Sequence, residues 1–177
     1  LGKNSPLIAA GRVLTMQALG GTGALKIGAD FLKQIVPNAK VAISNPSWEN
    51  HRALFERAGF EVVNYPYYDA ATHGLDFKAM IAFLRDLPAQ SIVVLHACCH
   101  NPTGVDATPE QWREIADVVK KGDLIPFLDI AYQGFGDGLE PDATAVRMFA
   151  EQDLTMFISS SFSKSFSLYG ERVGALT

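Results

Sequence analysis

A lysine lies among hydroxyl and aromatic side chains close to the carboxyl end of the sequence. The segment from Ser159 to Phe166 reads SSSFSKSF and follows a short apolar run. A lysine that is shielded from water loses part of its preference for the ammonium form, and its neutral amine can then form a Schiff base with an aldehyde. Most lysines instead lie on solvated surfaces. Lys164 therefore has two interpretations, a covalent catalyst and an ordinary loop residue.

A run of glycines, GGTGAL from Gly20 to Leu25, could bind a phosphate. Glycines at the start of a helix let backbone N–H groups approach an anion, and the helix dipole adds attraction. A tight turn without a ligand is the first alternative. The second is a dinucleotide-binding loop, but its third glycine position holds Lys26 and no clear acidic candidate ends a strand about 20 residues later. A phosphate site without a dinucleotide fits better.

Polar residues of this kind need a fold that brings them together, and the sequence predicts an α/β fold. Short apolar runs, rich in β-branched residues around 91–95, alternate with amphipathic segments, which indicates a mostly parallel sheet covered by helices. The Thr108-Pro109-Glu110-Gln111 segment has the residues of a helix start. The expected strands are 13–19, 41–44, 61–65, 92–95, 125–129 and 157–160, and the expected helices are 23–35, 49–58, 75–84 and 109–120.

Unusual polar residues follow four of these strands, at 20–23, 96–104, 129–132 and 159–164. In open α/β sheets ligands bind outside the carboxyl ends of the strands. We therefore expect these segments to form one site.

Composition supports a single domain that acts on small molecules. The chain has 177 residues, of which 48% are hydrophobic, enough for one sizeable core. Its net charge is −4, and its longest basic run is Lys120-Lys121, so nothing indicates binding to nucleic acid or to anionic membranes. The start of the chain lacks the pattern of a secretory signal, and Cys98 and Cys99 are adjacent, which suits reduced thiols. We expect a cytoplasmic protein.

Three motifs occur in order: Asn101 to Gly104 (NPTG), Asp129 to Tyr132 (DIAY) and Ser161 to Lys164 (SFSK). Together they resemble the fold-type I pyridoxal 5′-phosphate (PLP) enzymes of aminotransferase class I. The longer strings LHACCHNPTG (95–104), SLYGERVG (167–174) and NPSWENH (45–51) resemble the aspartate and aromatic amino acid subgroup, including tyrosine aminotransferases. The resemblance runs over the whole chain. It implies a three-layer α/β/α fold, the large PLP-binding domain over residues 1–177, as a fragment without the family's small domain.

The resemblance implies a role for each residue around the cofactor ring. Lys164 would bond to the PLP aldehyde and later carry a proton between the substrate Cα and the cofactor. Asp129 would pair with the protonated pyridine nitrogen, which keeps the ring able to accept electrons. His51 would hydrogen-bond Asp129, with Ser47 and His96 extending the network. Either histidine could instead be a satisfied core residue.

Further residues would surround the rest of the cofactor. Asn101 and Tyr132 would contact the phenolic oxygen, although an asparagine before Pro102 also suits a turn. Trp48 would stack on the ring, the alternative being a core position.

The phosphate would be bound by the helix start and by a guanidinium group. Gly21 and Thr22 would contribute at the helix start, together with Ser161 and Arg172. Arg172 could alternatively form an ion pair with Glu171. In relatives a serine often stands where this chain has Gly20.

The function implied by the resemblance is transfer of an amino group between an aromatic amino acid or aspartate and 2-oxoglutarate, by a homodimer and without a metal ion. The family's two arginines that bind substrate carboxylates have no position in this chain, so we expect cofactor binding without turnover from the fragment alone. One alternative is another fold-type I PLP enzyme, such as a lyase or decarboxylase. The other is a non-catalytic dimerisation module in which Lys164 and Asp129 are relics.

Overall fold

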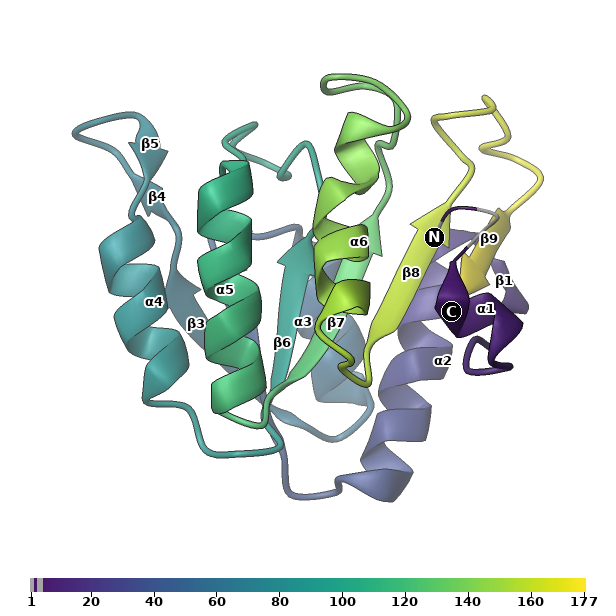
Figure 1. Ribbon diagram of the computed structural model, residues 1–177. Coiled ribbons are helices and arrows are strands. Elements are labelled where there is room, and N and C mark those ends of the chain that lie inside the picture. Colours follow the sequence, from purple (N-terminus) through teal and green to yellow (C-terminus); the bar gives the residue numbers. More distant parts are fainter. Residues whose placement is uncertain (1, 3–4) are drawn as a thin grey trace.

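A seven-stranded sheet organises the computed structural model, which describes residue 2 and residues 5–177 (Figure 1). The strand order is β1-β9-β8-β7-β6-β2-β3. Five strands, β3, β2, β6, β7 and β8, pair in parallel, as the sequence predicts. The strands are β1 (Met16–Leu19), β2 (Lys40–Asn45), β3 (Glu61–Pro66), β6 (Ile92–His96), β7 (Ile125–Ile130), β8 (Phe157–Ser161) and β9 (Val173–Leu176).

The strand β9 runs antiparallel to both of its neighbours, β8 and β1. It follows β8 through residues 162–172, which form a loop, whereas a parallel connection would need a crossover of a dozen or more residues, usually a helix. The sheet is therefore mixed, with one reversed strand beside the predicted lysine. The prediction of a mostly parallel sheet is confirmed.

Helices cover both faces of the sheet and give three layers (Figure 1). One face carries α4 (Phe77–Arg85), α5 (Pro109–Lys121) and α6 (Thr144–Glu151), and the other carries α2 (Gly20–Ile35) and α3 (Glu49–Arg57). Two further helices are short: α1 (Pro6–Ala9), and the 3₁₀ helix η1 (Pro141–Ala143), which directly precedes α6. No helix among the described residues has the length and apolar character needed to cross a membrane.

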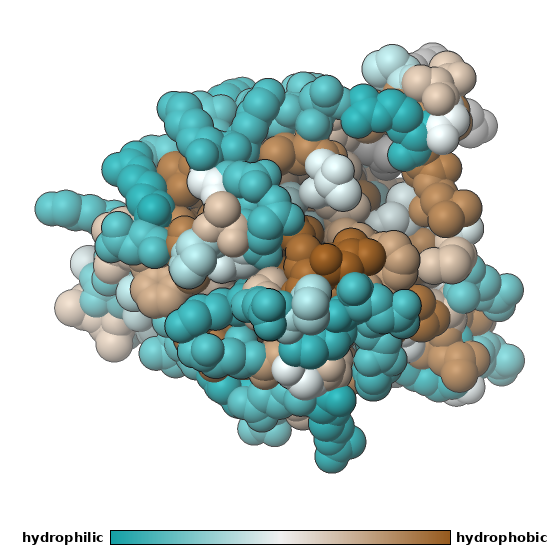
Figure 2. All heavy atoms as spheres, turned by 90° about the horizontal axis from the view of Figure 1, so that it is seen from below, coloured by the Kyte–Doolittle hydropathy of each residue, from teal (hydrophilic) through white to brown (hydrophobic). Residues whose placement is uncertain are grey.

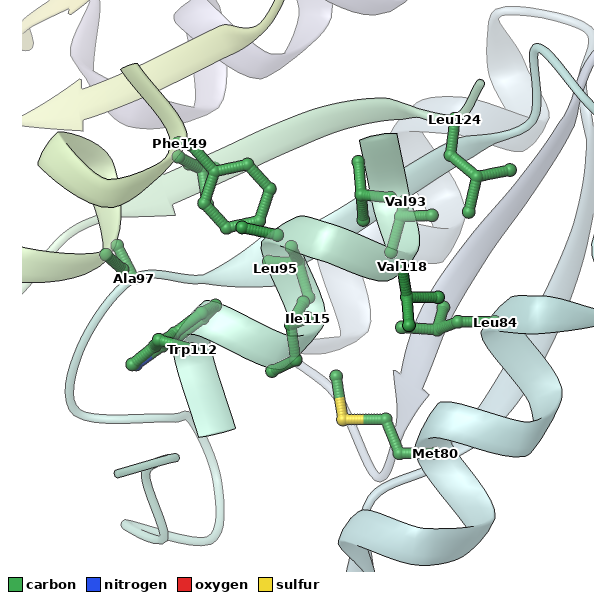
Figure 3. Packing of buried hydrophobic residues seen from close by; sticks show 14 of the residues in the cluster. Met80, Leu84, Val93, Leu95, Ala97, Trp112, Ile115, Val118, Leu124 and Phe149 are labelled. Atoms are coloured by element: carbon green, nitrogen blue, oxygen red, sulfur yellow. The ribbon is translucent and has the colours of Figure 1, made fainter. Parts of the chain in front are cut away.

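The helix α5 shows how local sequence builds the first layer. Thr108 accepts from the backbone N–H of Gln111, and the side chain of Gln111 accepts from the backbone of Thr108, the reciprocal cap that the sequence predicts. Trp112 and Ile115 then point into the core, where they pack with Phe149 of α6 and Leu95 of β6 (Figure 3). Apolar packing therefore joins α5 and α6 to this face of the sheet.

Several elements differ from the sequence-based expectation. The helix α2 begins at Gly20, three residues earlier than predicted, and β1 begins only at Met16. Between β3 and α4, which were predicted, the structure has an unpredicted small hairpin in which β4 (Tyr68–Asp69) pairs with β5 (Gly74–Leu75). Because Leu75 pairs with Tyr68 in this hairpin, α4 begins at Phe77 and not at Leu75 as predicted, and Asp76 caps its first turn. The helix α6 was not predicted.

The two ends of the sheet differ in chemical character. At the amino end of β8, apolar side chains including Met16, Phe31 and Met156 line a groove. Figure 2 views the molecule from this end, where hydrophobic residues (brown) lie among hydrophilic ones (teal). The polar residues singled out by the sequence lie at the opposite, carboxyl end of the parallel strands.

Candidate functional site

A cavity of about 230 Å³ lies at the carboxyl ends of the parallel strands. All nine residues that the resemblance assigns to the cofactor line it: Gly21, Thr22, Trp48, Asn101, Asp129, Tyr132, Ser161, Lys164 and Arg172. Four other residues share the lining, namely His96, Ala131, Ser163 and Tyr169. Segments as far apart in sequence as 21 and 172 therefore meet in one place.

The sheet register explains this convergence. His96 at the end of β6 lies opposite Asp129 of β7, and Asp129 lies opposite Ser159 of β8. Because neighbouring parallel strands end at the same edge, the loops that follow them open into one crevice. The hydroxyl of Ser159 donates to the carbonyl of Gly21 at 3.1 Å, which ties the start of α2 to the same edge.

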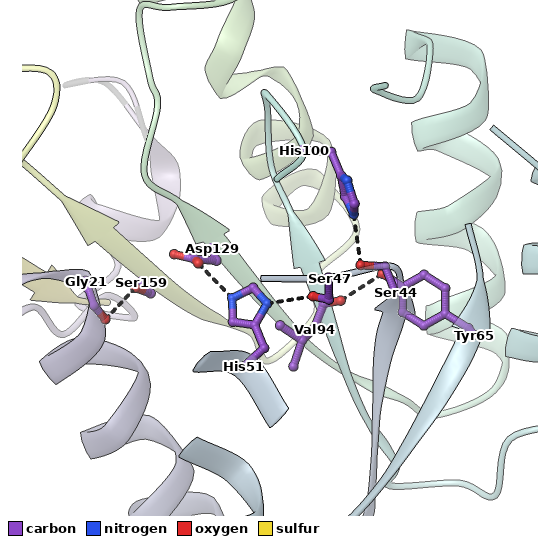
Figure 4. A network of polar contacts seen from close by, with 9 residues as sticks. All are labelled: Gly21, Ser44, Ser47, His51, Tyr65, Val94, His100, Asp129 and Ser159. Atoms are coloured by element: carbon purple, nitrogen blue, oxygen red, sulfur yellow. Dashed lines mark hydrogen bonds and ion pairs between the residues drawn. The ribbon is translucent and has the colours of Figure 1, made fainter. Parts of the chain in front are cut away.

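Asp129 belongs to a buried chain of hydrogen bonds (Figure 4). Its Oδ2 lies 2.9 Å from Nε2 of His51, and Nδ1 of His51 lies 3.0 Å from the hydroxyl of Ser47. His51 is 0% exposed and Asp129 is 5% exposed. The arrangement predicted for Ser47, His51 and Asp129 is present, and it fixes the orientation of a carboxylate that also faces the cavity.

His96 does not extend this chain by a hydrogen bond, contrary to the expectation. Its ring packs against the ring of His51 at 4.8 Å between centroids, and its buried Nε2 has no hydrogen-bond partner among the described residues. Burial, together with the neighbouring His51 and His100, lowers the pKa of His96 well below its usual value. The neutral ring lines the cavity, where a bound molecule could supply the missing partner.

Aromatic rings surround the amine of Lys164. Its Nζ lies 4.5 Å from the centre of the Tyr132 ring and 5.8 Å from that of Tyr169. Trp48 lines the cavity from the start of α3 and packs edge-on against His51, with 5.4 Å between ring centroids. Trp48 thus combines the two alternatives, a packed aromatic and a cavity wall. Tyr169 was not assigned a role, although it lies within the SLYGERVG string.

The start of α2 and Arg172 form the cationic end of the cavity. The backbone N–H of Gly20 donates to the carbonyl of Arg172 at 2.8 Å, and the guanidinium Nη1 donates to the carbonyl of Tyr169 at 2.9 Å. Within the described part of the chain Arg172 forms no ion pair, with Glu171 or with any other acid. Its charge and the N–H groups of Gly21 and Thr22 can therefore serve an anion.

Two glycines allow this close approach. Gly20 has φ of +69°, and a Cβ there would lie 2.5 Å from Nη2 of Arg172. A Cβ at Gly174 would lie 2.3 Å from the carbonyl carbon of Gly20. A serine at the Gly20 position would therefore require the Arg172 side chain to move.

A second polar cluster supports the segment that carries Asn101. Nε2 of His100 lies 2.8 Å from the hydroxyl of Ser44, and Nδ1 lies 2.8 Å from that of Thr103. The ring stacks on Tyr67 at 3.8 Å. Burial, and then the nearby His51, lowers the pKa of His100 to about 4, so the ring is neutral at neutral pH. Sequence reasoning missed this role, although the position within LHACCHNPTG was visible.

Cys98 and Cys99 are free, as predicted, with Cys98 buried and Cys99 half-buried. Burial, with smaller contributions from Asp106 and Asp142, raises the pKa of both thiols. Both are therefore protonated at neutral pH and unsuited to nucleophilic attack.

A cavity that combines a lysine, a buried carboxylate and a helix start, at the carboxyl edge of a mostly parallel sheet, defines a ligand-binding α/β domain. The family model for class I and II aminotransferases matches residues 1–177. The chain therefore belongs to the class I and II aminotransferase family, as the motifs indicate.

Two known relatives show which members of the family the chain resembles. The chain is 66% identical over 176 residues to an aspartate aminotransferase of Pseudomonas aeruginosa, with 99% of the chain and 44% of the relative covered. It is 57% identical over 176 residues to an aromatic-amino-acid aminotransferase of Escherichia coli, again with 99% and 44% covered. The chain thus spans less than half the length of these relatives.

A solved structure from Burkholderia pseudomallei, an aromatic-amino-acid aminotransferase covalently bound to pyridoxal phosphate, superposes with a TM-score of 0.99 at 70% identity. Another, from Psychrobacter sp. B6 and cocrystallised with aspartic acid, superposes with a TM-score of 0.97 at 51% identity. Each comparison covers 99% of this chain and 44% of the solved one. The three-layer fold expected from the motifs is that of this family.

Proposed function

We propose that the protein is a PLP-dependent aminotransferase that moves an amino group between an aromatic amino acid or aspartate and 2-oxoglutarate. The observation that carries the proposal is that Lys164, Asp129 and the start of α2 line one cavity. Relatives named for aspartate and for aromatic amino acids support both substrate classes.

The residues of the cavity fit PLP. An aldehyde can bond to the amine of Lys164, a protonated ring nitrogen suits the buried carboxylate of Asp129, and a phosphate suits the start of α2 beside Arg172. The buried and unpartnered Nε2 of His96 offers a further polar contact. Bound PLP would supply an aldehyde for covalent attachment and a ring that stores the electron pair left when a proton leaves Cα.

In this proposal each residue acts on its own part of the site. The amine of Lys164 would hold the cofactor through its aldehyde, and the free amine would be the base that moves the proton at the substrate Cα. Asp129 stays oriented because His51 bonds to it at 2.9 Å. A neutral His96 adds no cationic charge beside that carboxylate.

The remaining lining residues hold the cofactor in place. Asn101 and Tyr132 would contact its phenolic oxygen and stabilise the anionic form of that oxygen. Trp48 would cover one face of the ring. Gly21, Thr22, Ser161 and Arg172 would bind the phosphate.

The whole protein's assembly is also part of the proposal. We propose that residues 1–177 act as one domain of a longer polypeptide, that the polypeptide forms a homodimer, and that residues outside this chain bind the substrate carboxylates. The free cysteines Cys98 and Cys99 support a cytoplasmic location.

A visible absorbance spectrum tests the function. The longest polypeptide that contains this domain is purified and incubated with PLP, L-tyrosine or L-aspartate is added, and 2-oxoglutarate follows. We expect a cofactor band that shifts with the amino acid and returns with the 2-oxo acid, and no such band in Lys164→Ala. A band that forms and never cycles, in the longest polypeptide that contains this domain, would favour a lyase or decarboxylase. A folded polypeptide that never binds PLP would favour a dimerisation module.

A further inference from the structure

Asp142 organises the segment that follows Tyr132, called here the tyrosine loop (residues 131–142). Its Oδ2 accepts the backbone N–H groups of Gly134 at 2.7 Å and Gly136 at 3.0 Å, and its Oδ1 accepts that of Asp137 at 2.9 Å. Asp142 is 6% exposed. Hydrogen bonds to an ionised, buried carboxylate are stronger than neutral ones, so these three bonds set the shape of the loop.

The same carboxylate lies within 4.8 Å of the thiols of Cys98 and Cys99, a grouping that could hold a metal ion. However, both oxygens of Asp142 already accept backbone N–H groups. An oxygen engaged in this way is a poor metal ligand, because binding a cation would cost those hydrogen bonds. The carboxylate therefore belongs to the loop.

Ser165 links the tyrosine loop to the segment that carries Lys164. Its hydroxyl donates to the carbonyl of Gln133 at 2.9 Å, although the two residues are 32 positions apart. Ser165 directly follows Lys164, and Gln133 directly follows Tyr132. The hydrogen bond between Ser165 and Gln133 is therefore one residue away from both Lys164 and Tyr132. Nζ of Lys164 lies 4.5 Å from the centre of the Tyr132 ring.

We propose that Asp142 and Ser165 are positioning residues that together set the place of the Tyr132 hydroxyl relative to Lys164. Asp142 shapes the loop, and Ser165 clamps that loop to the lysine segment. Neither residue lines the cavity. This inference rests on the proposed function, because it assigns the Tyr132 hydroxyl to the bound cofactor.

A double-mutant cycle with bound PLP tests the link through Tyr132. We expect Ser165→Ala to weaken PLP binding by about threefold to tenfold, the range for one lost hydrogen bond, and to shift the pH midpoint of the visible band. In a Tyr132→Phe background, Ser165→Ala should weaken PLP binding by less than about twofold and should leave the pH midpoint of the visible band nearly unchanged. Ser165→Thr should restore the original midpoint, and Ser167→Ala, on the same segment, should leave it unchanged.

A measurement without cofactor tests the loop itself. Amide hydrogen exchange at Gly134 and Gly136 should be at least about tenfold faster in Asp142→Asn, and about threefold faster in Ser165→Ala. Asp137→Asn removes a charge from the same loop and should leave both amides unchanged.

PLP binding and amide hydrogen exchange test the proposed function and the positioning role separately. A wild-type chain without a visible band would count against the proposed function for this chain, while hydrogen exchange would still decide the positioning claim. Equal exchange in Asp142→Asn and Asp137→Asn would overturn the inference. So would a full effect of Ser165→Ala in the Tyr132→Phe background.

Discussion

Nε2 of His51 lies 2.9 Å from Oδ2 of Asp129, and this contact joins helix α3 to strand β7 beneath the cavity. Both side chains are almost completely buried. A buried carboxylate depends on its partner because water cannot replace the lost hydrogen bond. His51 therefore controls how Asp129 is presented to a bound ligand.

Replacing His51 tests that dependence. We expect His51→Leu, which has no hydrogen-bond donor, to reduce PLP affinity by about 10-fold to 100-fold, the range for a hydrogen bond to a charged group. Fluorescence or absorbance titration with PLP measures the change. His73→Leu is the matched control, since His73 lies on the exposed β4–β5 turn. An affinity in His51→Leu equal to that of His73→Leu would contradict this role.

Asp129→Asn keeps the shape of the side chain and removes its charge. We expect the variant to retain PLP but to react with L-aspartate or L-tyrosine at least about 100-fold more slowly, because a neutral amide no longer stabilises a protonated ring nitrogen. Stopped-flow absorbance measures the rate in the longest polypeptide that contains this domain. A rate within about threefold of wild type would rule out the assigned charge pairing.

The pKa of His100 predicts a pH-dependent stability. Its pKa is lowered to about 4, whereas an unfolded histidine has a pKa of about 6.5, so between these values the unfolded chain binds a proton that the folded chain does not. Stability from this group is complete above pH ~6.5 and is lost as the pH falls toward ~4, by an amount on the order of 3 kcal/mol.

Urea unfolding at pH 7 and pH 4.5 measures this effect. His100→Gln can keep one of the two side-chain contacts and does not titrate, so we expect the variant to lose clearly less stability than wild type over the same interval. His96 titrates in the same direction and remains in both proteins. An identical pH dependence in the two proteins would show that His100 does not carry the loss.

Gly174→Ala should damage both the fold and the anion site. The new Cβ would lie 2.3 Å from the carbonyl carbon of Gly20, whose N–H is bonded to Arg172. Backbone cannot move aside as a flexible side chain does, so we expect a loss of about 2 to 4 kcal/mol in unfolding free energy and weaker PLP binding.

Gly170→Ala is the control, because a Cβ there meets nothing within 4 Å. Thermal unfolding and PLP titration of the two variants make the comparison. Equal stability in both would show that the close approach of Gly174 to Gly20 is not required.

The strands were predicted correctly where the sequence pattern was strongest. Buried runs such as Ile92 to His96 have few competing structures, and the Thr108 cap marks a helix start by its own chemistry. The helix α6 was missed because its first turn follows η1 without a side-chain cap. The reversal of β9 was missed because pairing direction depends on the loop before it.

The residues of the candidate site also differ in how well the sequence predicts them. Residues that carry chemistry, such as Lys164 and Asp129, stand out by type and motif, and the structure brings them into one cavity. Residues that act by positioning other residues do not stand out in the sequence. The contact of Ser165 with Gln133 and the three bonds to Asp142 join loops whose proximity only the fold reveals.

The most direct test of the central claim is to locate the lysine that bonds to PLP. The chain is incubated with PLP, reduced with borohydride, digested and analysed by mass spectrometry, with Lys164→Arg as the matched control. We expect one phosphopyridoxyl group on Lys164 at equimolar PLP, and no comparable labelling in the variant. Equal labelling of exposed lysines such as Lys120, or undiminished labelling in Lys164→Arg, would contradict the assignment of this cavity as the cofactor site.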